Sequence, residues 1–195
     1  FAISKAYKIP YSGDQVLRLA VKREKNTALT ICRIEPENNI EMLISAVLMS
    51  EIKKYTIVGN WNNSVYSKVL YDKFNGNEKL HLINAVYDSQ KLAKMREACG
   101  LYLHGHSVGG TNPALVEMLF YDCHICCLDV SFNRFTAQNG VSFFSDDTDL
   151  QALISNILSK EPQIDNGSRD EIRMLYTRKK IACEYLAVFH EHGTQ

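Results

Sequence analysis

Short apolar runs alternate with stretches of helical periodicity along most of the chain. The apolar runs, rich in β-branched and aromatic residues, predict strands at 27–34, 54–60, 79–84, 101–105, 124–130 and 141–144. Apolar residues at helical spacing predict helices at 36–51, 62–74, 89–99, 113–122, 147–160, 168–176 and 177–191. Continuously apolar strands separated by helices indicate a parallel sheet that is buried on both faces.

The predicted fold is therefore α/β, a Rossmann-like doubly wound parallel sheet of about six strands flanked by helices. No internal repeat, low-complexity tract or flexible linker interrupts it, so we expect a single domain over residues 1–195. The chain opens as FAISKAYKIPYSGD, without Met. We expect residues 1–26 to be the lead-in from a missing N-terminal domain and residues 177–193 to be a closing helix.

The composition of the chain excludes some classes of binding partner. Lys and Arg together number 22, and Asp and Glu also number 22. This balance leaves no broad basic surface for nucleic acid or an anionic membrane. The six cysteines lie mostly in apolar runs such as HICCLDV, which favours core positions in a reducing compartment over a disulfide framework. No apolar stretch has membrane-spanning length. We expect a cytoplasmic protein with at most peripheral contact with the inner face of the membrane.

The stretch HGHSVGGTNPALVE, residues 104–117, follows the fourth predicted strand. It therefore lies at the carboxyl edge of the sheet, where open α/β folds bind ligands. Glycines let a ligand approach the backbone, and Thr111 or Asn112 can cap the next helix with Pro113 in its first position. Such a turn is an anion site suited to phosphate. Glu117, one turn into the helix, can accept hydrogen bonds from hydroxyls of the same ligand.

The residues of this stretch fit other kinds of site as well. The stretch also fits a tight turn that binds nothing. Gly105 and Gly110 have the spacing of a nucleoside-triphosphate P-loop, but Thr111 stands where that loop requires lysine, and the three-glycine dinucleotide pattern is absent. His104 and His106 suggest a metal, yet two ligands do not make a zinc site. We expect no metal, and we interpret His106 as a polar contact to the ligand.

Arg33 ends the first predicted strand. Because parallel strands share their carboxyl edge, it can reach the same crevice as the glycine stretch. A guanidinium beside backbone amides suits a diphosphate. The alternative is a surface ion pair with Glu35 or Glu37.

Together, the R-x-x-x-E-x-N pattern that begins at residue 33, IVGN, HGHSVGGTNPALVE and YTRKKIACEYLAVF resemble the C-terminal, donor-binding half of GT-B glycosyltransferases. The resemblance is to family 4, the retaining enzymes, and is greatest to bacterial rhamnosyltransferase-like members of polysaccharide and lipopolysaccharide assembly. It covers residue 9 to the last helix, and residues 104–117 are its most specific part.

This resemblance implies transfer of a sugar, rhamnose or another hexose, from a UDP- or dTDP-linked donor to a polysaccharide or lipid-linked saccharide. Configuration is retained, and no cofactor or metal is required. The acceptor would bind the missing N-terminal domain, so these 195 residues alone are expected to transfer no sugar.

The resemblance also assigns site residues. It implies donor contacts from Arg33, Gly109, Gly110, Thr111, Asn112 and Glu117, with Glu117 on the ribose, and base contacts from Val86 and Tyr87. Two positions depart from the family pattern: Gly109 stands where the family has a sugar-facing glutamate, and Asn38 where it has a lysine. The catalytic residues therefore stay open, with His106 and Asn112 as candidates. His106, Ser107, Thr111 or Asn112 would take over part of the missing carboxylate's work.

Two other functions compete. A nucleotide-sugar epimerase of GT-B architecture would bind a similar ligand, but it requires further acidic residues that the sequence does not supply. A non-catalytic α/β interaction module of the response-regulator type requires an acidic cluster after the first strand, where Arg33 lies instead.

Overall fold

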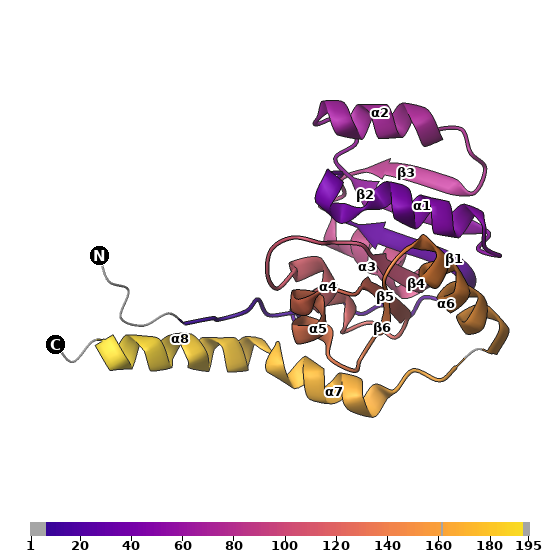
Figure 1. Ribbon diagram of the computed structural model, residues 1–195. Helices are drawn as coiled ribbons and strands as arrows, with labels where there is room; N and C mark the ends of the chain where they lie inside the picture. The colour runs from indigo at the N-terminus through magenta and orange to yellow at the C-terminus, as the bar shows by residue number, and fades with distance from the viewer. Residues whose placement is uncertain (1–6, 161, 193–195) are drawn as a thin grey trace.

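The computed structural model describes residues 7–160 and 162–192. Residues 1–6 of the expected lead-in and residue 193 of the expected closing helix lie outside the described residues. Six parallel strands form one sheet in the order β3-β2-β1-β4-β5-β6 (Figure 1), which confirms the predicted Rossmann-like doubly wound fold. The strands are β1 (Glu24–Ile31), β2 (Lys54–Gly59), β3 (Leu80–Asn84), β4 (Cys99–His104), β5 (His124–Leu128) and β6 (Ser142–Phe144).

Helices cover both faces of the sheet, and each layer has its own apolar core. One core packs α1 (Ile40–Leu48), α2 (Val65–Phe74) and α6 (Asp147–Lys160) against the sheet. The other packs α3 (Ser89–Ala98), α4 (Pro113–Met118), α5 (Ser131–Ala137) and α7 (Asn166–Leu175). Burial of both faces explains why the central strand β4 is buried along its whole length.

The first predicted helix is wrong in one respect. Instead of one helix over 36–51, the chain forms a 3-10 turn, η1 (Pro36–Asn38), and then α1, with Asn39 between them at φ 50°. Asn tolerates this left-handed conformation better than most residues, and its Nδ2 donates to the carbonyl of Gly105 at 2.8 Å. β1 also ends at Ile31, so Arg33 lies in the following loop and not at the strand's end.

Two further differences concern short elements. α5, which was not predicted, is seven residues long and carries only a weak periodic signal in the sequence SFNRFTA. Its buried Asn133 donates to the carbonyls of Leu128 and His106, and these bonds tie the helix to the end of β5 and to the loop after β4. α4 ends at Met118, four residues earlier than expected.

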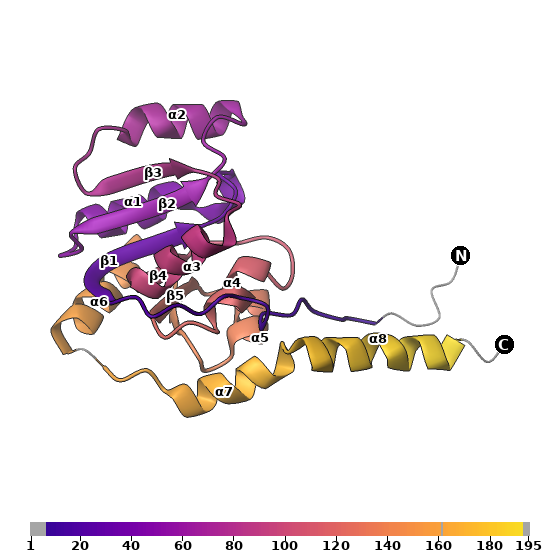
Figure 2. The same ribbon diagram turned by 180° about the vertical axis from the view of Figure 1, so that it is seen from behind.

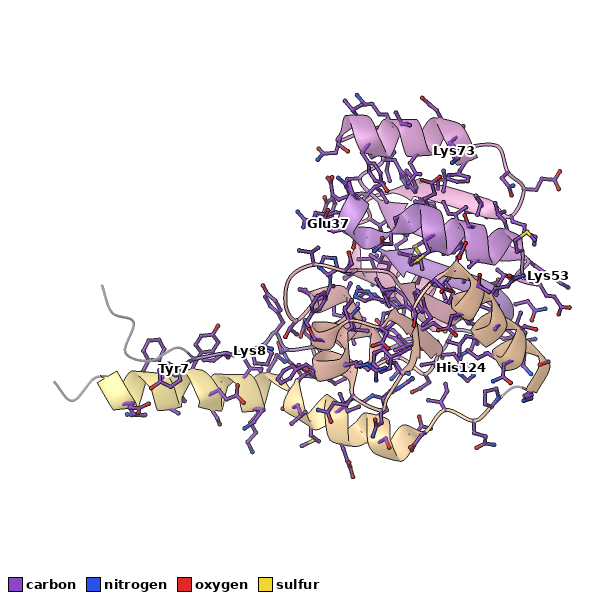
Figure 3. All side chains as sticks on the ribbon, viewed as in Figure 1. Tyr7, Lys8, Glu37, Lys53, Lys73 and His124 are labelled. Carbon is purple, nitrogen blue, oxygen red and sulfur yellow. The ribbon has the colours of Figure 1, made fainter. Side chains whose placement is uncertain are left out.

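The last helix, α8 (Arg178–His192), extends away from the sheet, and the N-terminal segment runs beside it (Figure 2). The Tyr7 hydroxyl donates to Glu191, and Lys8 Nζ lies 3.6 Å from the centre of the Phe135 ring, as the positions of Tyr7 and Lys8 in Figure 3 illustrate. α8 leaves apolar side chains exposed at Tyr185, Leu186 and Phe189. Within residues 7–160 and 162–192, no helix combines the length and apolar character needed to cross a bilayer.

Candidate functional site

A pocket of about 710 Å³ opens at the carboxyl edge of the sheet, between the loops that follow β1, β2, β3 and β4. We call it the carboxyl-edge pocket. The predicted site residues on its wall are Arg33, Val86, Tyr87, His106, Gly110, Thr111, Asn112 and Glu117. Gly109 and Ser107 are the predicted site residues that do not line it. The expectation that Arg33 and the glycine stretch share one crevice is therefore confirmed, although Arg33 lies beyond the strand.

The loops after β1 and β4 are joined by two hydrogen bonds next to the pocket-lining residues Asn38 and His106. The backbone N–H and the hydroxyl of Ser107 both donate to the carbonyl of Glu37, at 2.8 and 3.0 Å. Gly105 lies so close to the β1 loop that a Cβ there would stand 2.5 Å from the carbonyl oxygen of Asn38. The absence of a side chain at Gly105 is what allows the two loops to meet.

Gly105→Ala is therefore expected to lower the free energy of unfolding by about 1–3 kcal/mol, the usual effect of overpacking a tight site. The new methyl group would meet the backbone oxygen of Asn38, which cannot rotate away. Urea denaturation measures the change. Gly110→Ala is the matched control, because nothing lies within 4 Å of the Cβ that it adds. Equal stability of the two variants would contradict the close approach at Gly105.

Asn112 caps α4 as predicted, with its Oδ1 accepting from the backbone N–H of Ala114 at 2.9 Å, and Pro113 follows at the first helical position. α4 is only six residues long, so any anion at this loop must rely on local donors more than on a helix dipole. Thr111 Oγ1 is buried and has no hydrogen-bond partner among the described residues. An unpaired hydroxyl on a pocket wall indicates a place for a polar ligand.

The hydrogen-bond network fixes the tautomer of His106. Asn38 Nδ2 donates to the carbonyl of Arg33 at 3.0 Å, so Asn38 Oδ1 is the acceptor for His106 Nδ1 at 3.1 Å. Burial lowers the pKa of His106, and the nearby Arg33 charge lowers it further, while Glu37 opposes both. The ring is therefore neutral at pH 7, with Nε2 as a free acceptor.

The His106 ring lies next to Gly109, the position where the sequence resemblance led us to expect a glutamate. Gly109 has φ +115°, a conformation that side chains rarely adopt, and a Cβ there would stand 3.6 Å from His106 Nε2. A glutamate at Gly109 would be strained in this loop. The Nε2 nitrogen of His106 therefore lies close to Gly109.

The sequence left two roles open for Arg33, a contact to the ligand and a surface ion pair, and the structure is compatible with both. It lines the carboxyl-edge pocket, and its guanidinium also stands 3.9 Å from Glu37. The Arg33 side chain is 74% exposed, and an ion pair this long and this exposed contributes little to stability. The guanidinium can therefore turn to an anionic ligand at small cost.

Arg96 is the main site residue that sequence reasoning missed. It lies on α3, its side chain is only 9% exposed, and its Nη2 donates to Glu117 Oε2 on the pocket wall. Its Nε has no hydrogen-bond partner among the described residues. The available signal was its position: Arg96 falls on the same helical face as Leu92 and Ala93, where a charged residue is unusual.

Asn60 is a second residue of the pocket that the sequence did not single out. It follows β2, and its Oδ1 accepts from the backbone N–H of Ile34 at 2.7 Å. In the sequence the same Asn was interpreted only as the end of a strand. Its bond holds the start of the β1 loop against the end of β2, which keeps that wall of the pocket in place.

A separate pocket of about 400 Å³ lies at the opposite, amino edge of the sheet and includes Arg23, Lys25 and His124. It contains none of the predicted site residues. The cysteines are all free, and Cys123, Cys126 and Cys127 are buried. In the described part of the chain, no three His, Cys, Asp or Glu side chains are grouped to hold a metal ion.

Comparison with known proteins adds information on the fold. No protein-family model and no curated protein matches this sequence. Among solved structures, the pneumococcal O-GlcNAc transferase GtfA in complex with UDP and GlcNAc has a TM-score of 0.71 at 16% identity, covering 96% of this chain and 38% of that one. Sucrose-phosphate synthase from Thermosynechococcus elongatus has a TM-score of 0.79 at 14% identity, covering 94% of this chain and 51% of that one.

The lipopolysaccharide outer core galactosyltransferase WaaB has a TM-score of 0.71 at 12% identity, covering 94% of this chain and 54% of that one. The chain spans less than two thirds of the length of each of these three proteins. At such low identity the likeness concerns architecture. The chain thus has a Rossmann-like α/β fold that it shares with glycosyltransferases of GT-B architecture.

Proposed function

We propose that this chain is the donor-binding half of a glycosyltransferase that uses a nucleotide diphosphate sugar. The observation that carries the proposal is the carboxyl-edge pocket, whose lining combines the Arg33 guanidinium, part of the glycine loop and the Glu117 carboxylate. A nucleotide sugar offers the complementary groups, a diphosphate and several hydroxyls. A structurally similar transferase, GtfA, was solved with UDP and GlcNAc, which supports UDP as the nucleotide.

Each part of the donor has a partner in this proposal. Arg33 and the amides of residues 109–112 bind the diphosphate, since charge-assisted bonds and loop amides suit phosphate oxygens. The Glu117 carboxylate accepts hydrogen bonds from the ribose hydroxyls. The base lies near Val86 and Tyr87, and Tyr87 is 92% exposed at the pocket rim. His106 Nε2 accepts a hydrogen bond from a hydroxyl of the donor sugar. It takes the place of the glutamate carboxylate that the resemblance predicts at Gly109.

The reaction breaks the bond between the anomeric carbon and the diphosphate and forms a bond from that carbon to an acceptor hydroxyl oxygen, whose proton passes to an oxygen of the departing diphosphate. Arg33 and the loop amides stabilise the charge on the departing diphosphate without requiring a metal. We propose retention of configuration, as in family 4. Rhamnose or another hexose is the sugar, and a polysaccharide or lipid-linked saccharide, held outside this chain, is the acceptor.

Glu117 is the only acidic residue on the wall of the carboxyl-edge pocket in the described part of the chain. An epimerase would need further acid groups there, so this observation favours transfer over epimerisation. A non-catalytic α/β module gains no support from the wall either, because a basic residue, Arg33, follows β1.

UDP is expected to bind this chain without divalent metal. Titration of isotopically labelled protein with UDP in the presence of a chelator should shift the amide resonances of residues 105–112 first, because His106 and residues 110–112 of this loop line the carboxyl-edge pocket. dTDP is the comparison nucleotide, and inorganic sulfate controls for simple anion binding. Shifts confined to the amino edge of the sheet, around His124, would contradict the proposed function.

A further inference from the structure

We propose that Arg96 is a positioning residue for the donor's ribose, acting by holding the Glu117 carboxylate at the pocket wall. This inference rests on the proposed function, since it requires a nucleotide in the carboxyl-edge pocket. The contact that carries it is the ion pair between Arg96 Nη2 and Glu117 Oε2, which joins α3 to α4.

The burial of the pair indicates which partner faces the ligand. The Arg96 side chain is 9% exposed and the Glu117 side chain is 25% exposed. Both residues line the carboxyl-edge pocket, and the arginine is the more deeply buried partner, so the glutamate is the more accessible of the two to a ligand. One carboxylate oxygen is engaged by Arg96, so the group is held in one orientation before a ligand arrives.

Further contacts keep Arg96 in place. Its guanidinium lies 5.8 Å from the centre of the Tyr121 ring, and the Tyr121 hydroxyl donates to the carbonyl of Leu17 at 2.8 Å. α3 begins directly after the loop assigned to the base, with Asp88 as its cap. A rigid support of this kind reduces the ordering cost of binding.

Arg169, the other deeply buried arginine, shows how an arginine that serves only to stabilise the fold is bonded. Arg169 uses its donors on the main-chain carbonyls of Gly140, Tyr121 and Cys123. Arg96 donates to a pocket side chain and leaves its buried Nε without a partner among the described residues. A buried donor without a partner is unfavourable for folding, and such exceptions are typical of functional sites.

The test compares UDP with 2′,3′-dideoxyuridine diphosphate, which keeps the base and diphosphate but lacks both ribose hydroxyls. Wild-type protein should bind UDP at least about tenfold more tightly, the usual effect of losing hydrogen bonds to a charged group. Arg96→Gln should weaken the binding of UDP by about tenfold and leave the affinity for the dideoxy nucleotide unchanged. Only the contacts to the ribose hydroxyls depend on the position of Glu117. The variant Arg96→Gln/Glu117→Gln should bind UDP no more weakly than Glu117→Gln alone.

Arg173→Gln is the matched control. Arg173 is also largely buried, at 17% exposure, and it pairs with Asp122 outside the carboxyl-edge pocket. Arg173→Gln should leave the ratio between the affinities for UDP and for the dideoxy nucleotide at the wild-type value. If Arg96→Gln does not fold, Arg96→Lys keeps the cation with a different reach and should give a ratio between those of wild type and Glu117→Gln.

The outcomes separate the two proposals. Failure of UDP to bind wild-type protein overturns the proposed function. If UDP binds but Arg96→Gln weakens both nucleotides equally, or neither, the proposed function survives and the role of Arg96 is rejected. Equal binding of the two nucleotides by wild-type protein likewise rejects the ribose contact while keeping a nucleotide site.

Discussion

Replacing Arg169 with leucine is expected to lower the free energy of unfolding by about 3–5 kcal/mol, because a buried network would lose its charged partner. Arg169 is 3% exposed. Its Nε and Nη2 donate to the carbonyl of Gly140 at 3.1 and 2.8 Å, and its Nη1 donates to that of Cys123 at 2.9 Å. Leucine fills part of the volume but leaves these buried carbonyls without donors.

The effect is measured by urea denaturation monitored by circular dichroism. Arg178→Leu is the control, because it makes the same chemical change at a side chain that is 69% exposed and loosely paired with Asp14. It should stay within about 0.5 kcal/mol of wild type. Arg169 does not line the carboxyl-edge pocket, so UDP affinity of the folded variant should be unchanged. Wild-type stability of Arg169→Leu would mean that its hydrogen bonds do not hold α7 to the sheet.

Glu117→Gln is expected to weaken UDP binding by about 1.5–3 kcal/mol, or roughly 10–150-fold. The amide keeps the shape of the side chain but removes the charge that strengthens hydrogen bonds from the ribose hydroxyls. It also leaves the buried Arg96 without its carboxylate, so a loss of stability should accompany the loss of affinity. Calorimetric titration at a temperature where the variant is fully folded separates the two effects.

The control for this variant is Glu97→Gln. Glu97 is also a partly buried glutamate, at 10% side-chain exposure, and it is paired with Arg18 at 2.7 Å away from the carboxyl-edge pocket. It should lose some stability and keep its full affinity for UDP. Unchanged UDP binding by Glu117→Gln would make Glu117 a structural partner of Arg96 and remove it from the donor site.

The features that the sequence predicted correctly depend on local rules. The cap at Asn112 and the position of Pro113 follow from residue type alone, and both are found. The meeting of Arg33 with the glycine stretch needed only the parallel topology, which places the ends of β1 and β4 at one edge. An error of three residues in the end of β1 did not alter that result, because the loop stays at the same edge.

The features that the sequence did not predict depend on tertiary partners. The break at Asn39 is supported by a bond to Gly105, which is distant in the chain. The pairing of Arg96 with Glu117 requires α3 and α4 to lie side by side, and helical periodicity in one segment carries no information about this. The φ of Gly109, which explains why a glutamate is disfavoured there, is likewise a property of the folded loop.

The placement of β1 beside β4 also determines when this protein becomes competent to bind a ligand. The two strands pair in register at Leu29 and Tyr102, although β2 and β3 come between them in the chain. Bringing β1 and β4 together closes a long loop, which lowers the entropy of the chain before the contacts between the strands can form. The carboxyl-edge pocket takes its walls from both strands' loops, so it forms only after this closure. During synthesis, a ribosome-bound chain cannot hold a nucleotide until the segment through Glu117 has emerged, and ligand binding then favours the completed sheet over partly folded forms.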